Sequence, residues 1–341
     1  MTRALPADGV FQGGGIKGLA IAGALQEFES HQRLQVERWV NVAGTSAGAI
    51  IAAYLAADHS AQELADLIDR APFASFQDWG APGGRIIGGG LNLLRRRGLA
   101  RGELFRRWFD SELGGMTFKD VANGPNEDGS APAHPYRLRM VAADVTNHRM
   151  LVLPDDLHRY RLPGSARVID TDGFRVADAV RMSLSLPYFF EPVELVDAGT
   201  GKSVTIVDGG TVSNFPVWLF DTDREVLRRP TFGLRLIGGR PIGAGLKTFV
   251  RMLGWAAALA ADINQTQSSS WDERFVSRST RVRTCTVDAG DVATTDFELS
   301  RERRNDLLHG GRRAARAFLD SYDLEAYVNT FGRRLELGAH V

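Results

Sequence analysis

Apolar residues in the first 57 positions form two short runs and two longer ones, with glycines between them. The short runs are residues 10–11 and 39–43, and the longer runs are residues 19–28 and 49–57. A short apolar run bounded by turn residues predicts a buried strand, and a run of helical length predicts a helix. The order strand, loop, helix, repeated twice, predicts a parallel sheet whose faces are covered by helices.

The rest of the chain continues with the same two kinds of segment. Ser60 and Glu63 have the spacing of a capping box, which predicts a helix over residues 61–69. Pro187 ends a helical pattern over residues 176–186. Further strands are predicted at residues 137–145, 150–153, 204–207, 232–237 and 282–287, and a basic amphipathic helix at residues 301–319. Because no repeat or low-complexity linker interrupts this pattern, we expect an α/β fold in one compact domain.

Composition excludes several classes of protein. The 341 residues are 44% hydrophobic and 24% charged, which is close to the average of globular proteins. The 41 basic residues balance the 41 acidic ones, so no overall field favours nucleic acid or an anionic membrane. The single cysteine, Cys285, excludes an internal disulfide. The longest apolar run, residues 252–261, is half the roughly 20 residues that a spanning helix needs.

Neither the start of the chain nor its apolar runs indicates export. No apolar stretch of signal-peptide length follows Arg3. We therefore expect a cytoplasmic protein, or one that is peripheral on a membrane.

One segment has a different character from the rest. Residues 80–102 contain eight glycines, several apolar side chains and the triplet Arg95, Arg96 and Arg97. This composition predicts a mobile flap. The arginines are interpreted as a solvated charge run, with contact to anionic lipid headgroups as the alternative.

Gly44-Thr45-Ser46-Ala47-Gly48 matches the pattern G-x-S-x-G between a predicted strand and a predicted helix. Glycines on either side of the serine allow a tight turn that exposes the hydroxyl, and the helix N-terminus favours developing negative charge. An ordinary turn containing serine would have the same local pattern. The flanking elements favour a nucleophile at Ser46.

The stretch from Gly13 to Gly18 reads Gly-Gly-Gly-Ile-Lys-Gly and begins after the first predicted strand. It fits a dinucleotide-binding loop, but such a loop requires an acidic residue after the second strand, where this chain has the serine turn. A row of backbone N–H groups at a helix start can also form an oxyanion hole, which we favour. Lys17 is interpreted as a solvated lysine, with contact to a lipid phosphate as the alternative.

A nucleophilic serine requires a base. None of the seven histidines follows a predicted strand beside glycine or aspartate, where a triad histidine is expected. Asp208 does: it ends an apolar strand and is followed by Gly209 and Gly210. A carboxylate in that position can accept the serine proton directly.

These motifs, in this order, resemble those of the patatin-like phospholipases. Asn214 and Pro216 stand after the Asp-Gly-Gly motif where that family often has them, and residues 179–192, with Ser183, resemble the family's segment before the aspartate strand. The resemblance covers residues 8–220, the expected catalytic core. Residues 221–341 carry no family motif and are expected to continue the same domain.

The resemblance implies a three-layer α/β/α fold with a central, mostly parallel sheet flanked by helices. It also implies a catalytic dyad in which Ser46 is the nucleophile and Asp208 the general base. The other implied site residues are glycines: the oxyanion hole would be formed by Gly13, Gly14 and Gly15, and the motifs would be supported by Gly18, Gly44, Gly48, Gly209 and Gly210.

The implied activity is hydrolysis of acyl esters in phospholipids or other glycerolipids at a membrane surface, through an acyl-enzyme. The resemblance implies no metal and no other cofactor, and no nucleic acid as partner. Some bacterial members of the family are activated by cyclic nucleotides, but no site for such an activator is recognisable in the sequence.

Two other functions stay open on the residues alone. A serine esterase acting on small soluble esters would use a Ser–His–Asp triad, with His158 or His309 as the base. A non-catalytic nucleotide-binding module would use the glycines of residues 13–18.

Overall fold

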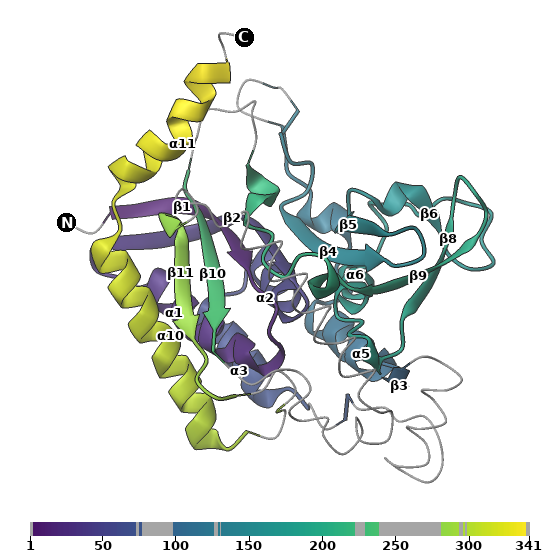
Figure 1. Cartoon of the computed structure of the whole chain (residues 1–341), viewed down its shortest axis with the longest axis horizontal. Helices are drawn as coiled ribbons and strands as arrows, with labels where there is room; N and C mark the ends of the chain where they lie inside the picture. The colour runs from purple at the N-terminus through teal and green to yellow at the C-terminus, as the bar shows by residue number, and fades with distance from the viewer. Residues whose placement is uncertain are drawn as a thin grey trace.

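The computed structural model describes residues 3–72, 75–76, 98–125, 129, 131–221, 229–238, 281–292, 296 and 299–338. Two sheets and their flanking helices account for most of these residues (Figure 1). The strands are β1 (Arg3–Phe11), β2 (Leu34–Thr45), β3 (Gly98–Ala100), β4 (Leu138–Asp144), β5 (Arg149–Leu153), β6 (Tyr160–Arg161), β7 (Tyr188–Phe190), β8 (Val193–Asp197), β9 (Ser203–Asp208), β10 (Thr231–Ile237) and β11 (Thr284–Asp288). The α-helices are α1 (Gly18–Phe28), α2 (Ala47–Ala56), α3 (Ala61–Arg70), α5 (Glu103–Glu112), α6 (Val176–Ser183), α10 (Arg301–Ser321) and α11 (Leu324–Gly338).

The larger sheet has the order β11-β10-β1-β2-β4-β9-β8-β6, and β5 pairs with β4. Strands β11, β10, β1, β2 and β4 are parallel, as predicted, whereas β5, β9, β8 and β6 join by antiparallel pairing. The predicted mostly parallel sheet flanked by helices is therefore confirmed, and antiparallel strands extend it from β4.

Most predicted elements are present with different ends. The capping box at Ser60 forms as predicted, because the Ser60 hydroxyl accepts from the Glu63 N–H while the Glu63 carboxylate accepts from the Ser60 N–H. The helix predicted over residues 176–186 ends three residues early, at Ser183. Beyond Ser183 the helical pattern of backbone bonds stops: the Ser185 N–H bonds to the Met182 carbonyl, and the Ser185 carbonyl accepts the Asp208 N–H from β9.

Both faces of the parallel half are buried. Val10 and Phe11 are neighbours in β1, and both are fully buried. They belong to separate clusters of core residues, because successive strand residues point to opposite faces. The Phe11 side is covered by α1, α2 and α10, and the Val10 side by the segment around Phe215. Helices on one face and this segment on the other hold the carboxyl ends of β1 and β2 in place.

Helix α10 packs against α1 and β11, along the edge of the molecule where Figure 1 draws it in yellow. A Cβ atom at Gly23 would collide with the backbone carbonyl of Leu308, and one at Gly311 with that of Ala20. Glycine at these two positions lets the two helices approach to backbone contact.

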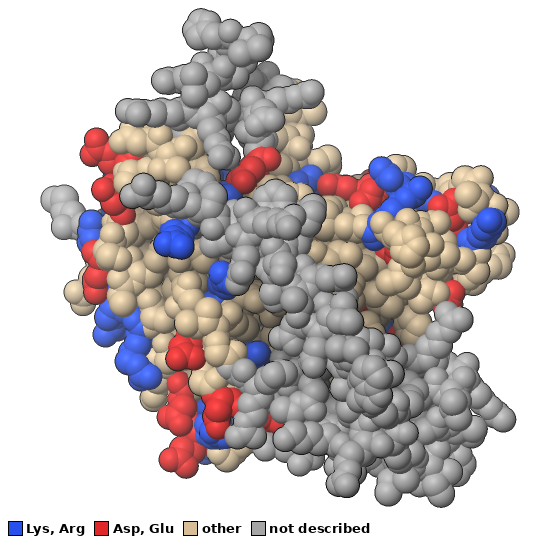
Figure 2. All heavy atoms as spheres, viewed as in Figure 1, with Lys and Arg blue, Asp and Glu red and all other residues tan. Residues whose placement is uncertain are grey.

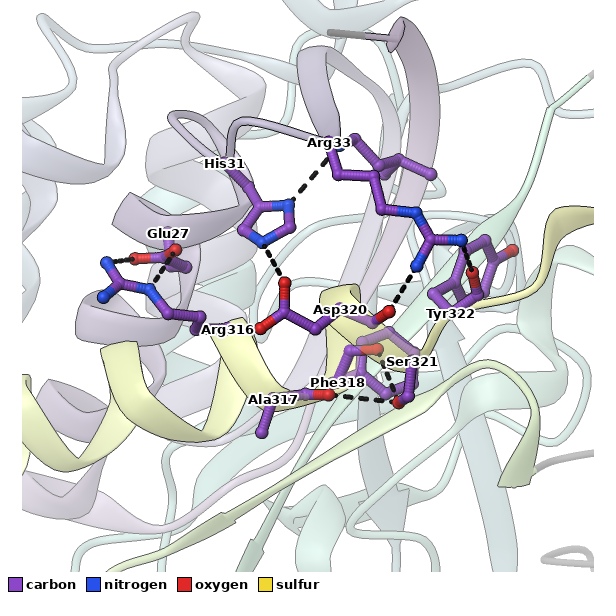
Figure 3. A network of polar contacts seen from close by, with 10 residues as sticks. Glu27, His31, Arg33, Arg316, Ala317, Phe318, Asp320, Ser321 and Tyr322 are labelled. Carbon is purple, nitrogen blue, oxygen red and sulfur yellow. Dashed lines mark hydrogen bonds and ion pairs between the residues drawn. The ribbon is translucent and has the colours of Figure 1, made fainter.

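Polar contacts join the second half of α10 to the end of α1 and to the turn between α1 and β2 (Figure 3). Glu27, whose side chain is buried, accepts two hydrogen bonds from Arg316 at 2.9 and 3.0 Å. His31 accepts from the Leu34 N–H through Nδ1, so its Nε2 carries the proton that faces Asp320 at 3.2 Å. Helix α10 is thereby tied to the segment that leads into β2.

On the face drawn in Figure 2, Lys and Arg side chains are interspersed with Asp and Glu side chains over the described residues, in keeping with the balanced composition. Within the described ranges, no helix has both the length and the apolar character required to cross a membrane.

Candidate active site

Ser46 is the single residue between β2 and α2, so the predicted strand and helix do flank it. Its dihedral angles, φ 56° and ψ −125°, lie in a region that residues other than glycine rarely adopt. A Cβ atom at Gly44 would collide with the Gly48 carbonyl, and one at Gly48 with the carbonyl of Phe11. The two motif glycines are therefore required for this sharp turn.

The side chain of Ser46 is not used to cap the helix that follows it. Serine at an N-cap usually accepts a hydrogen bond from an N–H in the first turn. Ser46 is the N-cap of α2 but makes no such bond, and its side chain is only partly buried. The Ser46 hydroxyl is thus available for chemistry.

Strand register explains how Asp208 reaches Ser46 from 162 positions further along the chain. One edge of β4 pairs with β5, and the other edge is shared by β2 and β9. Strand β2 runs parallel to β4 and ends with Thr45 opposite Val141; β9 runs antiparallel and ends with Asp208 opposite Ala142. The two strands therefore run toward each other and end at adjacent positions on β4.

Asp208 is 2% exposed, and burial raises the pKa of its carboxyl group to about 6, although contacts with the Ser46 side chain and the Gly210 N–H lower it. Gly210 donates to Oδ1 at 2.7 Å. Oδ2 accepts no hydrogen bond of normal geometry from the described residues. The Ser46 hydroxyl is nevertheless close enough to Asp208 to lower the pKa of its carboxyl group.

The C-terminal end of α6 and the turn that follows it hold the backbone of both residues. The Ser183 hydroxyl accepts from the Ser46 N–H at 3.0 Å and donates to the Val141 carbonyl at 2.7 Å. The Asp208 N–H donates to the Ser185 carbonyl at 2.9 Å. In the sequence, Ser183 could be noted only for its place before the aspartate strand, because its two partners, Ser46 and Val141, come from distant parts of the chain.

Glycines also adjoin Asp208 and the turn before α1. A Cβ atom at Gly209 would collide with the Val141 carbonyl, so the chain after Asp208 passes directly over β4. Gly15 has φ 58°, and Gly18 packs against α2, where an added Cβ would lie 3.9 Å from that of Ala47.

The Gly13 N–H is engaged within the fold. It donates to the Asn214 carbonyl at 3.2 Å, and the Asn214 side chain donates back to the Gly13 carbonyl at 3.2 Å. In the part of the chain that the structure describes, the N–H groups of Gly14 and Gly15 make no such bond. Burial lowers the pKa of the nearby Lys17 amine. The sequence did not single out Asn214 for this role, because the pairing joins residues 201 positions apart.

The structure describes six of the seven histidines, all but His340, and none of the six hydrogen-bonds to Ser46 or Asp208. His158 faces the Asp155 carbonyl at 2.7 Å, and His309 is exposed on α10. Among all the residues that the structure describes, no group of His, Cys, Asp and Glu side chains could hold a metal ion. The Arg95–97 triplet and most of the predicted flap lie outside the described residues.

The fold and the site define an α/β protein with a strained serine elbow beside a buried aspartate. A family model described as patatin-like phospholipase matches residues 9–221, more than half of the chain. The chain therefore belongs to the patatin-like phospholipase family, whose members are lipid hydrolases.

Further similarities are to a curated protein in sequence and to solved structures in fold. The uncharacterized protein YqhO of Bacillus subtilis (strain 168) is 36% identical over 328 residues, covering 92% of this chain and 98% of YqhO. Among solved structures, VipD from Legionella pneumophila is similar with a TM-score of 0.50 and 17% identity, covering 93% of this chain and 67% of VipD. A chain in the structure of the ExoU–SpcU heterodimeric complex from Pseudomonas aeruginosa matches with a TM-score of 0.43 and 17% identity. The match covers 99% of this chain and 60% of the matched chain.

Proposed function

We propose that this protein hydrolyses acyl esters of phospholipids or other glycerolipids, with Ser46 as the nucleophile and Asp208 as the general base. The observation that carries the proposal is the register of β2 and β9, which end at adjacent positions on β4 and so bring the two residues together. Family membership supports a lipid substrate.

In the first half of the reaction, Ser46 Oγ attacks the ester carbonyl carbon and its proton passes to Asp208. The tetrahedral intermediate carries an oxyanion, which donors fixed in advance stabilise by several kcal/mol. We assign those donors to the N–H groups of Gly14 and Gly15, because the Gly13 N–H already bonds to Asn214. Collapse of the intermediate releases the alcohol, which takes the proton from Asp208.

In the second half, water attacks the acyl carbonyl carbon and Asp208 accepts its proton. Collapse of this intermediate breaks the bond to Ser46 Oγ, which takes the proton back from Asp208, and the fatty acid leaves. An ordinary aspartate is a weak base at neutral pH. The pKa of about 6 brings Asp208 close to the operating pH while leaving it ionised, which suits a general base. The substrate is reached at a membrane surface, and the enzyme itself is cytoplasmic or peripheral on the membrane.

The test uses the full chain and vesicles of defined phospholipid, with products analysed by mass spectrometry. Wild type should release fatty acid and lysolipid, and Ser46→Ala should release neither. A fluorophosphonate probe, which reacts with nucleophilic serines, should label wild type and not Ser46→Ala. Labelling that persists in Ser46→Ala would refute the nucleophile.

The same assay separates the rival functions. Wild type that hydrolyses a short soluble ester but no vesicle lipid would favour a soluble esterase. Loss of turnover in His158→Ala or His309→Ala, with Asp208→Asn active, would favour a triad. Absence of labelling in wild type would favour a non-catalytic module.

A further inference from the structure

The pairing of β2 with β4 ends one residue before Ser46. Thr45 is the last residue of β2 that pairs with β4, opposite Val141. The next position on that edge of β4, opposite Ala142, is taken by Asp208. The Ser46 N–H therefore has no strand partner at the point where the backbone enters its positive-φ conformation.

The Ser183 hydroxyl supplies that missing acceptor. A hydroxyl has one hydrogen to donate and two lone pairs that accept. Because the Ser183 hydrogen goes to the Val141 carbonyl, Ser183 Oγ accepts the hydrogen bond from Ser46. Ser183 is fully buried, so no solvent is present to replace it.

The same turn also determines where Asp208 lies. Two residues after Ser183, the Ser185 carbonyl accepts the Asp208 N–H. The side chain of Ser185 bonds to Arg181, which in turn donates to the carbonyls of Arg101 and Glu191. The turn is thus anchored on one side and holds both members of the dyad on the other.

We propose that Ser183 is a positioning residue for catalysis: through its hydroxyl it holds the Ser46 backbone in the strained conformation that directs Oγ toward Asp208. This inference rests on the proposed dyad. Removing the hydroxyl should leave Ser46 chemically intact but misplaced. Misplacement by about 1 Å lowers rates on the order of 10²-fold.

A matched control is available at the other end of the sheet. The Tyr327 hydroxyl is also buried, and it accepts the Thr231 N–H at 2.9 Å. Tyr327→Phe therefore removes one buried acceptor from a backbone N–H, as Ser183→Ala does, but at a strand start remote from Ser46. Both variants should lower the thermal midpoint.

The experiment compares wild type, Ser183→Ala and Tyr327→Phe, each well below its thermal midpoint. Two rates are measured, fluorophosphonate labelling and hydrolysis of a short soluble ester. Ser183→Ala should slow both rates by about 10- to 100-fold. For the ester, the loss should be in kcat with KM nearly unchanged, because the ester still binds and only the attack by Ser46 is impaired. Tyr327→Phe should keep both rates near the wild-type values.

Wild-type rates in Ser183→Ala would overturn the proposal, and so would an equal loss in Tyr327→Phe. If Ser183→Ala does not fold, Ser183→Cys decides, because a thiol occupies the same place but is a weak acceptor. Slowed labelling in a stable Ser183→Cys supports the positioning role, and wild-type labelling overturns it. Failure of the dyad itself would be recognised separately, as labelling that persists in Ser46→Ala.

Discussion

Replacing Asp208 with asparagine should inactivate the protein and also stabilise it. Asparagine matches the shape of aspartate, and its Oδ1 can still accept from the Gly210 N–H. It carries no charge, however, so it cannot accept the Ser46 proton. Wild type must keep a buried carboxylate ionised at neutral pH, with Oδ2 unpartnered among the described residues, and the variant does not.

The size of the effect follows from the pKa. Burial raises the pKa of Asp208 from 3.8 to about 6. At about 1.4 kcal/mol per pKa unit, this shift corresponds to about 3 kcal/mol. Between these two values the folded protein binds more protons than the unfolded chain, so the free energy of unfolding falls as pH rises. The loss is complete above the folded-state pKa.

Urea unfolding of wild type and Asp208→Asn at pH 5 and pH 8 measures this difference. The variant should be more stable by up to about 3 kcal/mol at pH 8, and by about half as much at pH 5. Asp197→Asn is a control of opposite sign, because the Thr200 N–H and other donors lower the pKa of Asp197. That variant should be less stable than wild type at pH 8.

Equal or lower stability of Asp208→Asn at pH 8 would refute the reasoning. A gain of the same size at both pH values would also refute it, because the gain would then come from packing rather than charge.

Four further outcomes are expected. The kcat/KM for a short ester should fall as pH drops through about 6, since Asp208 must be ionised; a midpoint that moves in a histidine variant would contradict this. Ser46→Gly should have a free energy of unfolding about 1 kcal/mol higher than that of Ser46→Ala in urea unfolding, because glycine adopts positive φ without strain. Gly48→Ala should lower the free energy of unfolding, measured in urea, by more than about 1 kcal/mol, because the added Cβ collides with the Phe11 carbonyl. Ser60→Ala should cost about 1 kcal/mol of unfolding free energy through loss of the helix cap, with full activity in the ester assay.

Local features of the fold could be predicted from residue order. The two apolar runs before glycines became β1 and β2, and Ser46 lies between a strand and a helix as expected. The reason is that the turn is a local feature: the backbone turns so sharply there that Gly44 and Gly48 have no room for a Cβ atom. Asp208 could be proposed as the base because an apolar strand ending in Asp-Gly-Gly is also a local pattern.

Pairings between distant segments were decided only by tertiary structure. Nothing in the composition of β9 shows that it is antiparallel to β4, or that Asp208 lies opposite Ala142, one position beyond Thr45's partner. The hydrogen bond of Gly13 to Asn214 and the early end of α6 at Ser183 have the same origin. A buried donor or acceptor must find a hydrogen-bond partner. Which distant group is near enough to be that partner is decided only when the strands have come together.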